Sequence, residues 1–259
     1  MAKCRAPQIS PEICEIIPAM ELVDDNYYCK RCGQLSVSFL PKGIAYCRAC
    51  LGLGRITAKD YLVRIKTTQK FSRAQPYLTW AGTLTPAQAQ VSQALCESLR
   101  RRKSHLVHAV TGAGKTEMMF AVVDQALAQG LRICWATPRI DVVNELFPRL
   151  QAAFTNLKIG KYHGKEYCEP QFDQLCLCTT HQLLKFYHAF DVIVIDEVDA
   201  FPYQNSAMLH FGAAQALQPT GISIYLTATP TAAQLALVAE GKINYSCLNR
   251  RFHGGLLPV

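Results

Sequence analysis

Residues 109–117 of the chain read AVTGAGKTE, and residues 192–199 read VIVIDEVD. The first stretch predicts a phosphate-binding loop, and the second predicts a buried strand that ends in adjacent carboxylates. Asp196 follows Lys115 by 81 residues. Alone, each pattern also fits an ordinary glycine-rich turn or a solvated acidic strand end. In this order and at this spacing, the two patterns indicate a nucleoside-triphosphate motor domain.

The predicted loop binds phosphate through its backbone. An apolar strand at 105–110 precedes it, and a helix begins at Lys115. Gly112 and Gly114 permit backbone angles that turn N–H groups toward phosphate oxygens. We expect Lys115 to reach the β and γ phosphates of ATP and the Thr116 hydroxyl to ligate Mg²⁺. The predicted nucleotide contacts in this loop are Thr111, Gly112, Ala113, Gly114, Lys115 and Thr116.

The carboxylates at 196–199 follow a nearly continuous apolar run, which is typical of a buried parallel strand. Open α/β sheets bind their ligands at the carboxyl ends of such strands. Because Mg²⁺ prefers oxygen ligands, Asp196 is the predicted magnesium ligand beside Thr116. Glu197 is then placed to orient the attacking water, and Asp199 to bridge toward other motifs. The predicted catalytic residues are therefore Lys115, Asp196 and Glu197.

The segment Thr85-Pro86-Ala87-Gln88 opens a helix before the loop. Thr85 is a suitable cap, Pro86 suits the first helical position, and Gln88 can close a capping box. Gln88 has a second candidate role, because an amide side chain can both donate to and accept from an adenine edge. With the phosphate-binding loop following closely, we favour adenine contact by Gln88.

Two cysteine pairs, Cys29 with Cys32 and Cys47 with Cys50, stand 14 residues apart. Two CxxC knuckles can deliver four thiolates to a tetrahedral Zn²⁺. Redox or disulfide chemistry is the alternative. The residues between the pairs predict a hairpin, and the metal would hold a module too small for a core of its own. Basic and aromatic neighbours suit nucleic acid as well as solvent, so DNA contact by the module is left open.

The composition limits the protein class. The chain has 259 residues and a formal net charge of +8, which suits a polyanionic partner. No apolar run approaches the roughly 20 residues that span a bilayer, and the first ten residues, MAKCRAPQIS, lack an apolar signal core. The other eight cysteines look structural and reduced. We therefore expect a cytoplasmic protein that does not insert into a membrane.

Beyond the loop, strand and helix patterns alternate. This alternation predicts an α/β fold, a parallel sheet sandwiched by helices, with the four-cysteine module in front. The expected strands lie at 131–136, 157–162, 175–178, 191–195 and 222–226, and the expected helices begin near 115, 139, 181 and 207.

Several short stretches together resemble the motifs of superfamily 2 helicases: AVTGAGKTE, TPR, TTHQLL, DEVD and LTATP, with LTPAQ as the preceding glutamine segment. The resemblance implies a RecA-like fold. The cysteine module and RRFHGG at 250–255 make the whole chain similar to the amino-terminal part of the ComFA family of late-competence ATPases. That similarity implies ATP-driven movement of single-stranded DNA during natural competence. It also implies partners among the competence proteins at the inner face of the cell membrane, where the protein would be peripheral.

The resembled motifs also suggest residue roles. Pro138, Arg139, Thr180 and His181 stand at strand-to-helix junctions, where helix N-termini and hydroxyls can hold DNA phosphates. Simple helix capping is the alternative for these four. Thr227 and Thr229 resemble the motif that couples the nucleotide to the DNA site, together with Asp199. A strand end and a helix cap are their alternative role.

We divide the chain into a zinc-binding segment at 1–58, a connector at 59–84, a RecA-like lobe at 85–248 and the start of an interlobe segment at 249–259. These residues lack the arginine-bearing motifs of a second lobe, so we expect slow ATP hydrolysis by them alone. Two alternatives are an adaptor that binds zinc and nucleotide without turnover, and a fragment of a primosome-type restart helicase. Homo-oligomerisation is left open.

Overall fold

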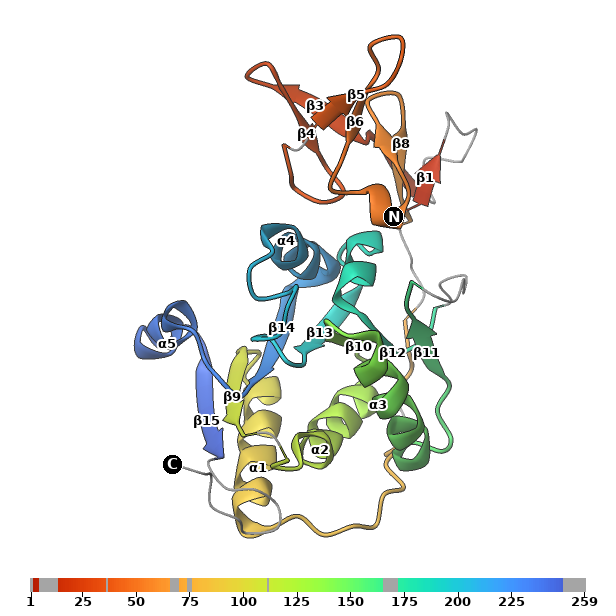
Figure 1. Cartoon of the computed structure of the whole chain (residues 1–259). Coiled ribbons are helices and arrows are strands. Elements are labelled where there is room, and N and C mark those ends of the chain that lie inside the picture. Colours follow the sequence, from red (N-terminus) through yellow and green to blue (C-terminus); the bar gives the residue numbers. More distant parts are fainter. Residues whose placement is uncertain are drawn as a thin grey trace.

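The computed structural model describes residues 2–4, 14–35, 37–65, 70–73, 76–110, 112–164 and 172–248. The predicted nucleotide contact of Thr111 and the predicted interlobe segment 249–259 lie outside these residues. Figure 1 shows a small module of short strands next to a larger α/β lobe. Every helix in the described part of the chain is too short or too polar to cross a bilayer.

The lobe is built on a parallel sheet. Within the described residues it has seven strands in the order β11-β12-β10-β13-β14-β9-β15, and every neighbouring pair is parallel. The strands are β9 (His105–Ala109), β10 (Ile133–Thr137), β11 (Ile159–Tyr162), β12 (Leu175–Thr179), β13 (Phe190–Ile195), β14 (Leu217–Thr227) and β15 (Asn244–Leu248).

Helices cover both faces of this sheet, and the side-chain alternation of the strands divides the core between them. Along β10, Ile133 and Trp135 pack with α1, α2 and α3, whereas Cys134 and Ala136 pack with η2 and α4. The predicted α/β sandwich is therefore confirmed. The helices are α1 (Pro86–Arg100), α2 (Lys115–Ala128), α3 (Ile140–Ala153), the 3₁₀ helix η2 (Thr180–Lys185), α4 (Ala207–Ala216) and α5 (Ala232–Ala239).

Three elements differ from the prediction or were not foreseen. The helix expected near 181 is the short 3₁₀ helix η2, because only ten residues separate the end of β12 from the start of β13. Helix α5 was not predicted, and none of its residues is buried. Strand β15 was not predicted either, and it adds a parallel edge beside β9.

The amino-terminal module consists of short antiparallel strands. One sheet has the order β1-β8-β2, β3 pairs with β4, and β5-β6-β7 form another sheet that includes the expected hairpin. Strand β8 falls within the segment proposed as a connector. The elements are β1 (Ala2–Cys4), β2 (Cys14–Pro18), β3 (Met20–Val23), β4 (Asn26–Cys29), β5 (Val37–Phe39), β6 (Ala45–Cys47), η1 (Leu51–Leu53), β7 (Ile56–Thr57) and β8 (Tyr61–Ile65).

The module packs on the lobe beside α4 (Figure 1). The Gln215 side chain donates a 3.1 Å hydrogen bond to the Lys30 carbonyl. Gly33 lies so close to Phe211 that a Cβ added there would be 2.6 Å from Cδ2 of the ring. The Arg64 guanidinium lies 3.7 Å from the centroid of the Tyr187 ring. The four cysteines thus belong to the same buried cluster as side chains of η2 and α4.

Candidate functional site

The phosphate-binding loop connects β9 to α2 at the carboxyl edge of the sheet. Gly112 and Gly114 have φ angles of +79° and +73°, in the left-handed region that glycine adopts readily. Gly114 is also the N-cap of α2, so the helix begins at Lys115 with its first amides directed at the loop. The backbone therefore has the form that the sequence predicts for a phosphate site.

The carboxylates after β13 lie beside this loop. Asp196 is 6% exposed, and burial raises its pKa to about 6, against the opposing effect of the nearby Lys115 charge. Thr116 is also buried. The Glu197 Oε2 atom is buried and has no hydrogen-bond partner among the described residues. Oxygen donors with one orphaned carboxylate oxygen fit Mg²⁺ and its water ligands.

Gln88 takes part in the capping box and also contacts the loop. Its Oε1 accepts from the Thr85 amide at 2.9 Å, and its Nε2 donates to the Ala113 carbonyl at 2.8 Å. Both ends of the amide are thus engaged in a side chain that is 2% exposed. The contact with Ala113 places Gln88 against the phosphate-binding loop, while adenine contact stays a prediction.

The predicted coupling residues lie together. The Thr229 hydroxyl donates to Asp199 Oδ2 at 2.6 Å, and the Thr229 amide donates to the Thr227 hydroxyl at 3.0 Å. Burial is the largest single effect and acts to raise the pKa of Asp199. The hydrogen bonds from Thr229, Thr227 and the backbone, together with the Lys115 charge, outweigh it, so the pKa is lowered. The acidic strand end is therefore tied directly to the loop after β14.

The four predicted DNA contacts differ in accessibility. Arg139 is exposed and pairs with Asp141 through two contacts, one of them 3.2 Å between Nε and Oδ1. Pro138 is buried, and His181 is half-buried. Thr180 is fully buried, and its hydroxyl has no partner within the described part of the chain. Of these side chains, only Arg139 presents its charged group to solvent.

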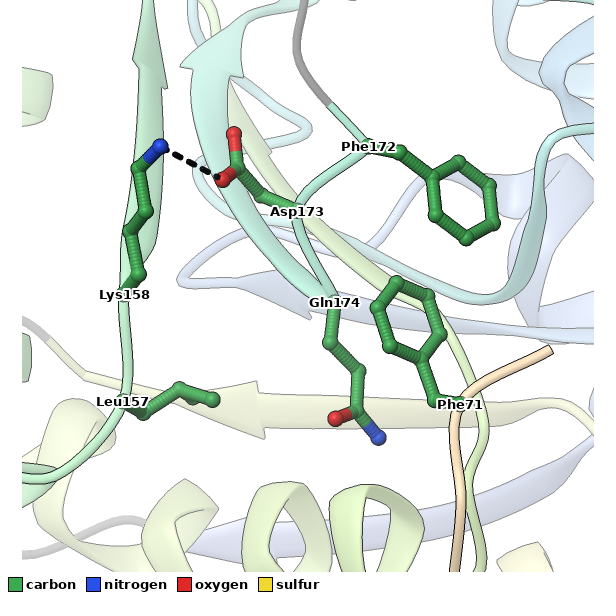
Figure 2. A pocket seen from close by; sticks show the side chains of 6 residues that line it. All are labelled: Phe71, Leu157, Lys158, Phe172, Asp173 and Gln174. Atoms are coloured by element: carbon green, nitrogen blue, oxygen red, sulfur yellow. Dashed lines mark ion pairs between the residues drawn. The ribbon is translucent and has the colours of Figure 1, made fainter. Parts of the chain in front are cut away.

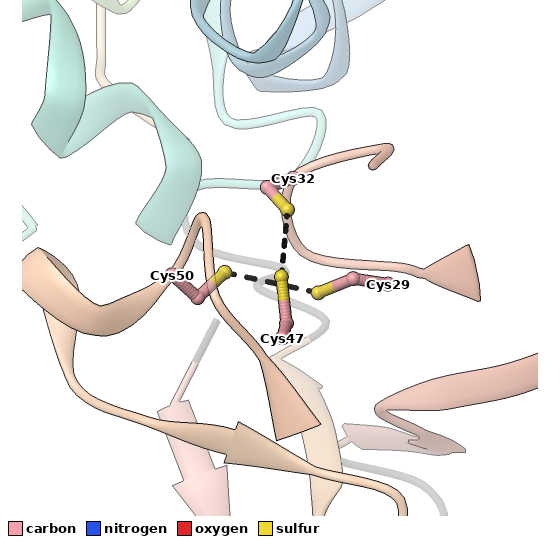
Figure 3. A group of neighbouring side chains, drawn as sticks. All are labelled: Cys29, Cys32, Cys47 and Cys50. Atoms are coloured by element: carbon pink, nitrogen blue, oxygen red, sulfur yellow. Dashed lines mark hydrogen bonds between the residues drawn. The ribbon is translucent and has the colours of Figure 1, made fainter. Parts of the chain in front are cut away.

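The four cysteines of the module converge (Figure 3). Their sulfur atoms all lie within 4.8 Å of one another, and all four residues are buried. The Cys29–Cys50 and Cys32–Cys47 sulfur distances are 3.7 Å and 3.5 Å. Tetrahedral Zn²⁺ with Zn–S bonds near 2.3 Å places its sulfurs about 3.8 Å apart. The donor set and its spacing therefore fit a closed structural zinc site.

Arg31 is a buried cation that donates hydrogen bonds to the cysteine cluster. This residue is only 4% exposed. Its guanidinium donates to Cys50 Sγ at 3.3 Å and to the carbonyls of Cys50 and Leu53 at 3.1 and 3.3 Å. Hydrogen bonding to Cys29 and Cys32, with the Arg31 charge, lowers the pKa of the Cys50 thiol. A buried cation next to four thiolates would reduce their net charge, which favours metal binding.

A separate hollow of about 300 Å³ lies where β11 and β12 begin, at the edge of the sheet opposite the phosphate-binding loop (Figure 2). Phe71 and Phe172 stack there with ring centroids 4.7 Å apart. The Arg132 guanidinium lies 4.6 Å from the Phe172 centroid, and Lys158 pairs with Asp173 at 3.7 Å. The Phe71–Phe172 stack joins the segment before α1 to the lobe, and the hollow is remote from the phosphate-binding loop.

Two residues near the site were not predicted. The Trp135 indole donates to Asp196 Oδ2 at 3.4 Å from the neighbouring strand β10. His108 Nε2 bonds the Ala228 carbonyl at 3.0 Å and so contacts the loop that carries Thr227 and Thr229. Both residues lie in stretches that the sequence predicts as strands, where each would be interpreted as an ordinary core or edge residue. The pairing of distant strands supplies these contacts, and nothing in the local sequence indicates them.

The chain matches known proteins over most of its length. Residues 81–232 match the family described as "Type III restriction enzyme, res subunit". The chain is 42% identical over 251 residues to "Competence protein ComFA" of Streptococcus pneumoniae, covering 96% of this chain and 57% of that protein. It is 38% identical over 239 residues to ComFA of Bacillus subtilis, covering 90% of this chain and 52% of that protein. The chain thus spans a little over half the length of these curated relatives, and the resemblance to ComFA is confirmed.

A solved structure resembles the lobe. A hypothetical ATP-dependent RNA helicase from Sulfolobus tokodaii superposes with a TM-score of 0.50 at 18% identity, covering 64% of this chain and 53% of that one. At this identity the likeness concerns the fold alone. It agrees with the parallel sheet and flanking helices described above.

Proposed function

The chain belongs to the family described as type III restriction enzyme, res subunit, and from that premise we propose that it is the nucleotide-binding lobe of an ATP-dependent single-stranded DNA translocase. The observation that carries the proposal is that three motifs meet at one edge of the sheet: the phosphate-binding loop, the acidic strand end and the loop after β14. The phosphate-binding loop lies beside Asp196, and Asp199 of the same acidic strand end bonds Thr229. The predicted nucleotide contacts would thereby be linked, through Asp199, to the loop after β14.

In this proposal, the loop amides and Lys115 would hold the triphosphate, while Thr116 and Asp196 would hold Mg²⁺. The bound ion would neutralise charge on the phosphate oxygens. Glu197 orients the attacking water, since its orphaned Oε2 is available as an acceptor. Zn²⁺, held by the four cysteines, has a structural role in the amino-terminal module. Arg139, with Pro138, Thr180 and His181, would form the path for DNA phosphates.

The similarity to ComFA proteins supports a role in DNA uptake during natural competence. We propose that the chain works with other competence proteins at the inner face of the membrane, without inserting into it. In competent cells, a Lys115→Ala copy should reduce transformation by external DNA. Normal transformation with that copy would contradict this role.

The biochemical test is ATP hydrolysis with single-stranded, duplex and forked DNA of matched sequence. We expect plain single strands to stimulate hydrolysis, and Lys115→Ala to remove the stimulation. ATP binding without any turnover would favour the adaptor alternative. Preferential stimulation by forks would favour a restart-type helicase.

A further inference from the structure

Phe201 is the most exposed large apolar side chain among the described residues, at 85%, and the next is Ile65 at 71%. It follows the acidic strand end directly, four positions after Glu197. A single exposed aromatic residue on a protein surface needs no explanation by its exposure alone. Phe201 differs from such a residue because its loop is held by hydrogen bonds and because that loop follows the acidic strand end.

The loop around Phe201 is held on both sides. The Ala200 amide donates to the Glu197 carbonyl at 2.9 Å, and the Ser206 amide donates to the Tyr203 carbonyl at 3.1 Å. Tyr203 is 5% exposed, and its ring centroid lies 4.6 Å from that of His210 on α4. The outward position of Phe201 is therefore set by an anchored loop, so its ring is presented with little freedom to collapse onto the protein.

The loop that carries Phe201 leaves the sheet at its carboxyl edge, and Arg139 follows the end of the adjacent strand. Strand β13 leads to Phe201 and β10 leads to Arg139, and the two strands pair in register at Ala136 and Ile195. Pairing with Asp141 raises the pKa of Arg139, and the nearby Glu197 charge adds to this effect. A cation therefore lies near the carboxylate proposed to orient the attacking water, and the exposed Phe201 follows that carboxylate by four positions.

We propose that Phe201 stacks on an unpaired base of single-stranded DNA that crosses this edge, while Arg139 contacts a backbone phosphate. The inference rests on the proposed function and adds a base-contacting residue to it. Stacking on an aromatic ring tolerates any base, because every base has a π face. Asp199 lies two positions before Phe201, and it accepts a hydrogen bond from Thr229 in the loop after β14. The loop that holds the stacked base would therefore also contact the loop after β14.

The test measures binding of the full 259-residue chain to fluorescent oligothymidylate. Base–aromatic stacking contributes on the order of 1–3 kcal/mol, so Phe201→Ala should weaken binding about five-fold or more. Phe201→Trp should bind as tightly as the parent, and its added tryptophan fluorescence should be quenched by DNA. Phe201→Leu keeps an apolar side chain without a ring and should behave like Phe201→Ala. Phe39→Ala is the matched control, because Phe39 is 63% exposed on the amino-terminal module.

A strand of the same length without bases separates stacking from phosphate contact. On this strand, the parent and Phe201→Ala should bind equally. Parent-like binding by Phe201→Leu would overturn the inference, because an apolar side chain without an aromatic ring would then be sufficient. Unchanged binding by Phe201→Ala would also overturn it while leaving the proposed function intact. If the parent chain binds no single strand at all, the proposed function fails together with the inference.

Discussion

The amino-terminal module and the nucleotide-binding lobe are stabilised by different means. The phosphate-binding loop rests on a core of large apolar side chains from α1, α2, α3 and the sheet. In the module, the four cysteines are themselves a large part of the buried residues, and few large apolar side chains accompany them. The lobe can therefore hold its loops through packing alone, whereas we expect the module to depend on Zn²⁺ bound by its thiols.

The two regions nevertheless share one buried cluster. The cysteines pack with side chains of η2 and α4, and α4 begins shortly after the acidic strand end. The four-cysteine cluster is therefore part of the core on the sheet face that η2 and α4 cover, while the phosphate-binding loop rests on the core of the opposite face, with α1, α2 and α3. Loss of metal should therefore destabilise α4 more than the phosphate-binding loop.

The largest expected effect comes from removing zinc. Structural zinc binding corresponds to about 10–16 kcal/mol of apparent free energy, so Cys29→Ser with Cys32→Ser should unfold the module. Elemental analysis should find about one zinc per chain in the parent and none in the variant. Hydrogen exchange should rise across the described part of 14–65 and in α4, and change little in β9 and α2. Cys96→Ser, outside the cluster, is the control.

Protein purified without chelator that contains no zinc would contradict the metal assignment. If β9 and α2 lost as much protection from hydrogen exchange as α4, the result would contradict the idea that the two faces of the sheet respond separately.

The next effect concerns turnover in the lobe. Glu197→Gln should abolish hydrolysis and leave nucleotide binding nearly intact, because the amide cannot take up a proton from the attacking water. Steady-state hydrolysis and equilibrium binding of ATP measure the two properties separately. Glu145→Gln, whose parent side chain is 72% exposed on α3, should change neither. Wild-type turnover in Glu197→Gln would refute the assigned role.

A smaller effect tests the contact between module and lobe. Gly33 and Gly43 both have a φ of +70°, but only at Gly33 would an added Cβ meet Phe211. Gly43→Ala should cost roughly 1–2 kcal/mol for the left-handed backbone. Gly33→Ala should cost more and should destabilise the packing of the module on α4. Chemical unfolding followed at both regions measures the difference, and equal costs would show that the contact with Phe211 contributes little.

The smallest effect concerns DNA phosphates. Arg139→Ala should weaken binding to all single strands alike and reduce the salt dependence by about 0.7 in the log–log slope, corresponding to one lost phosphate contact. Arg100→Ala is the control, since the Arg100 and Arg139 side chains are equally exposed, at 54%. A loss confined to particular base sequences would count against a phosphate contact.

The sequence predicts well what local chemistry dictates. The glycine angles of the phosphate-binding loop, the capping box at Thr85 and the convergence of the CxxC pairs each follow from residue type and short spacing. Cys247, one of the eight cysteines interpreted as structural, is exposed on the edge strand β15, which was not predicted.

Contacts between distant residues could not be predicted in this way. Gly33 meets Phe211, and Trp135 reaches Asp196, only because of how the chain folds. Helix α5 was missed because its sequence, AAQLALVA, is apolar on all sides and shows no amphipathic period.

We expect the lobe to bind Mg-ATP through the phosphate-binding loop that precedes α2. Calorimetric titration of the parent and Lys115→Ala with Mg-ATP tests it most directly. We expect about one nucleotide per parent chain, binding that requires Mg²⁺, and an affinity about ten-fold or more lower in Lys115→Ala, since a charge-assisted phosphate contact is lost. Equal affinity in the two proteins, or no ATP binding by the parent, would contradict the account.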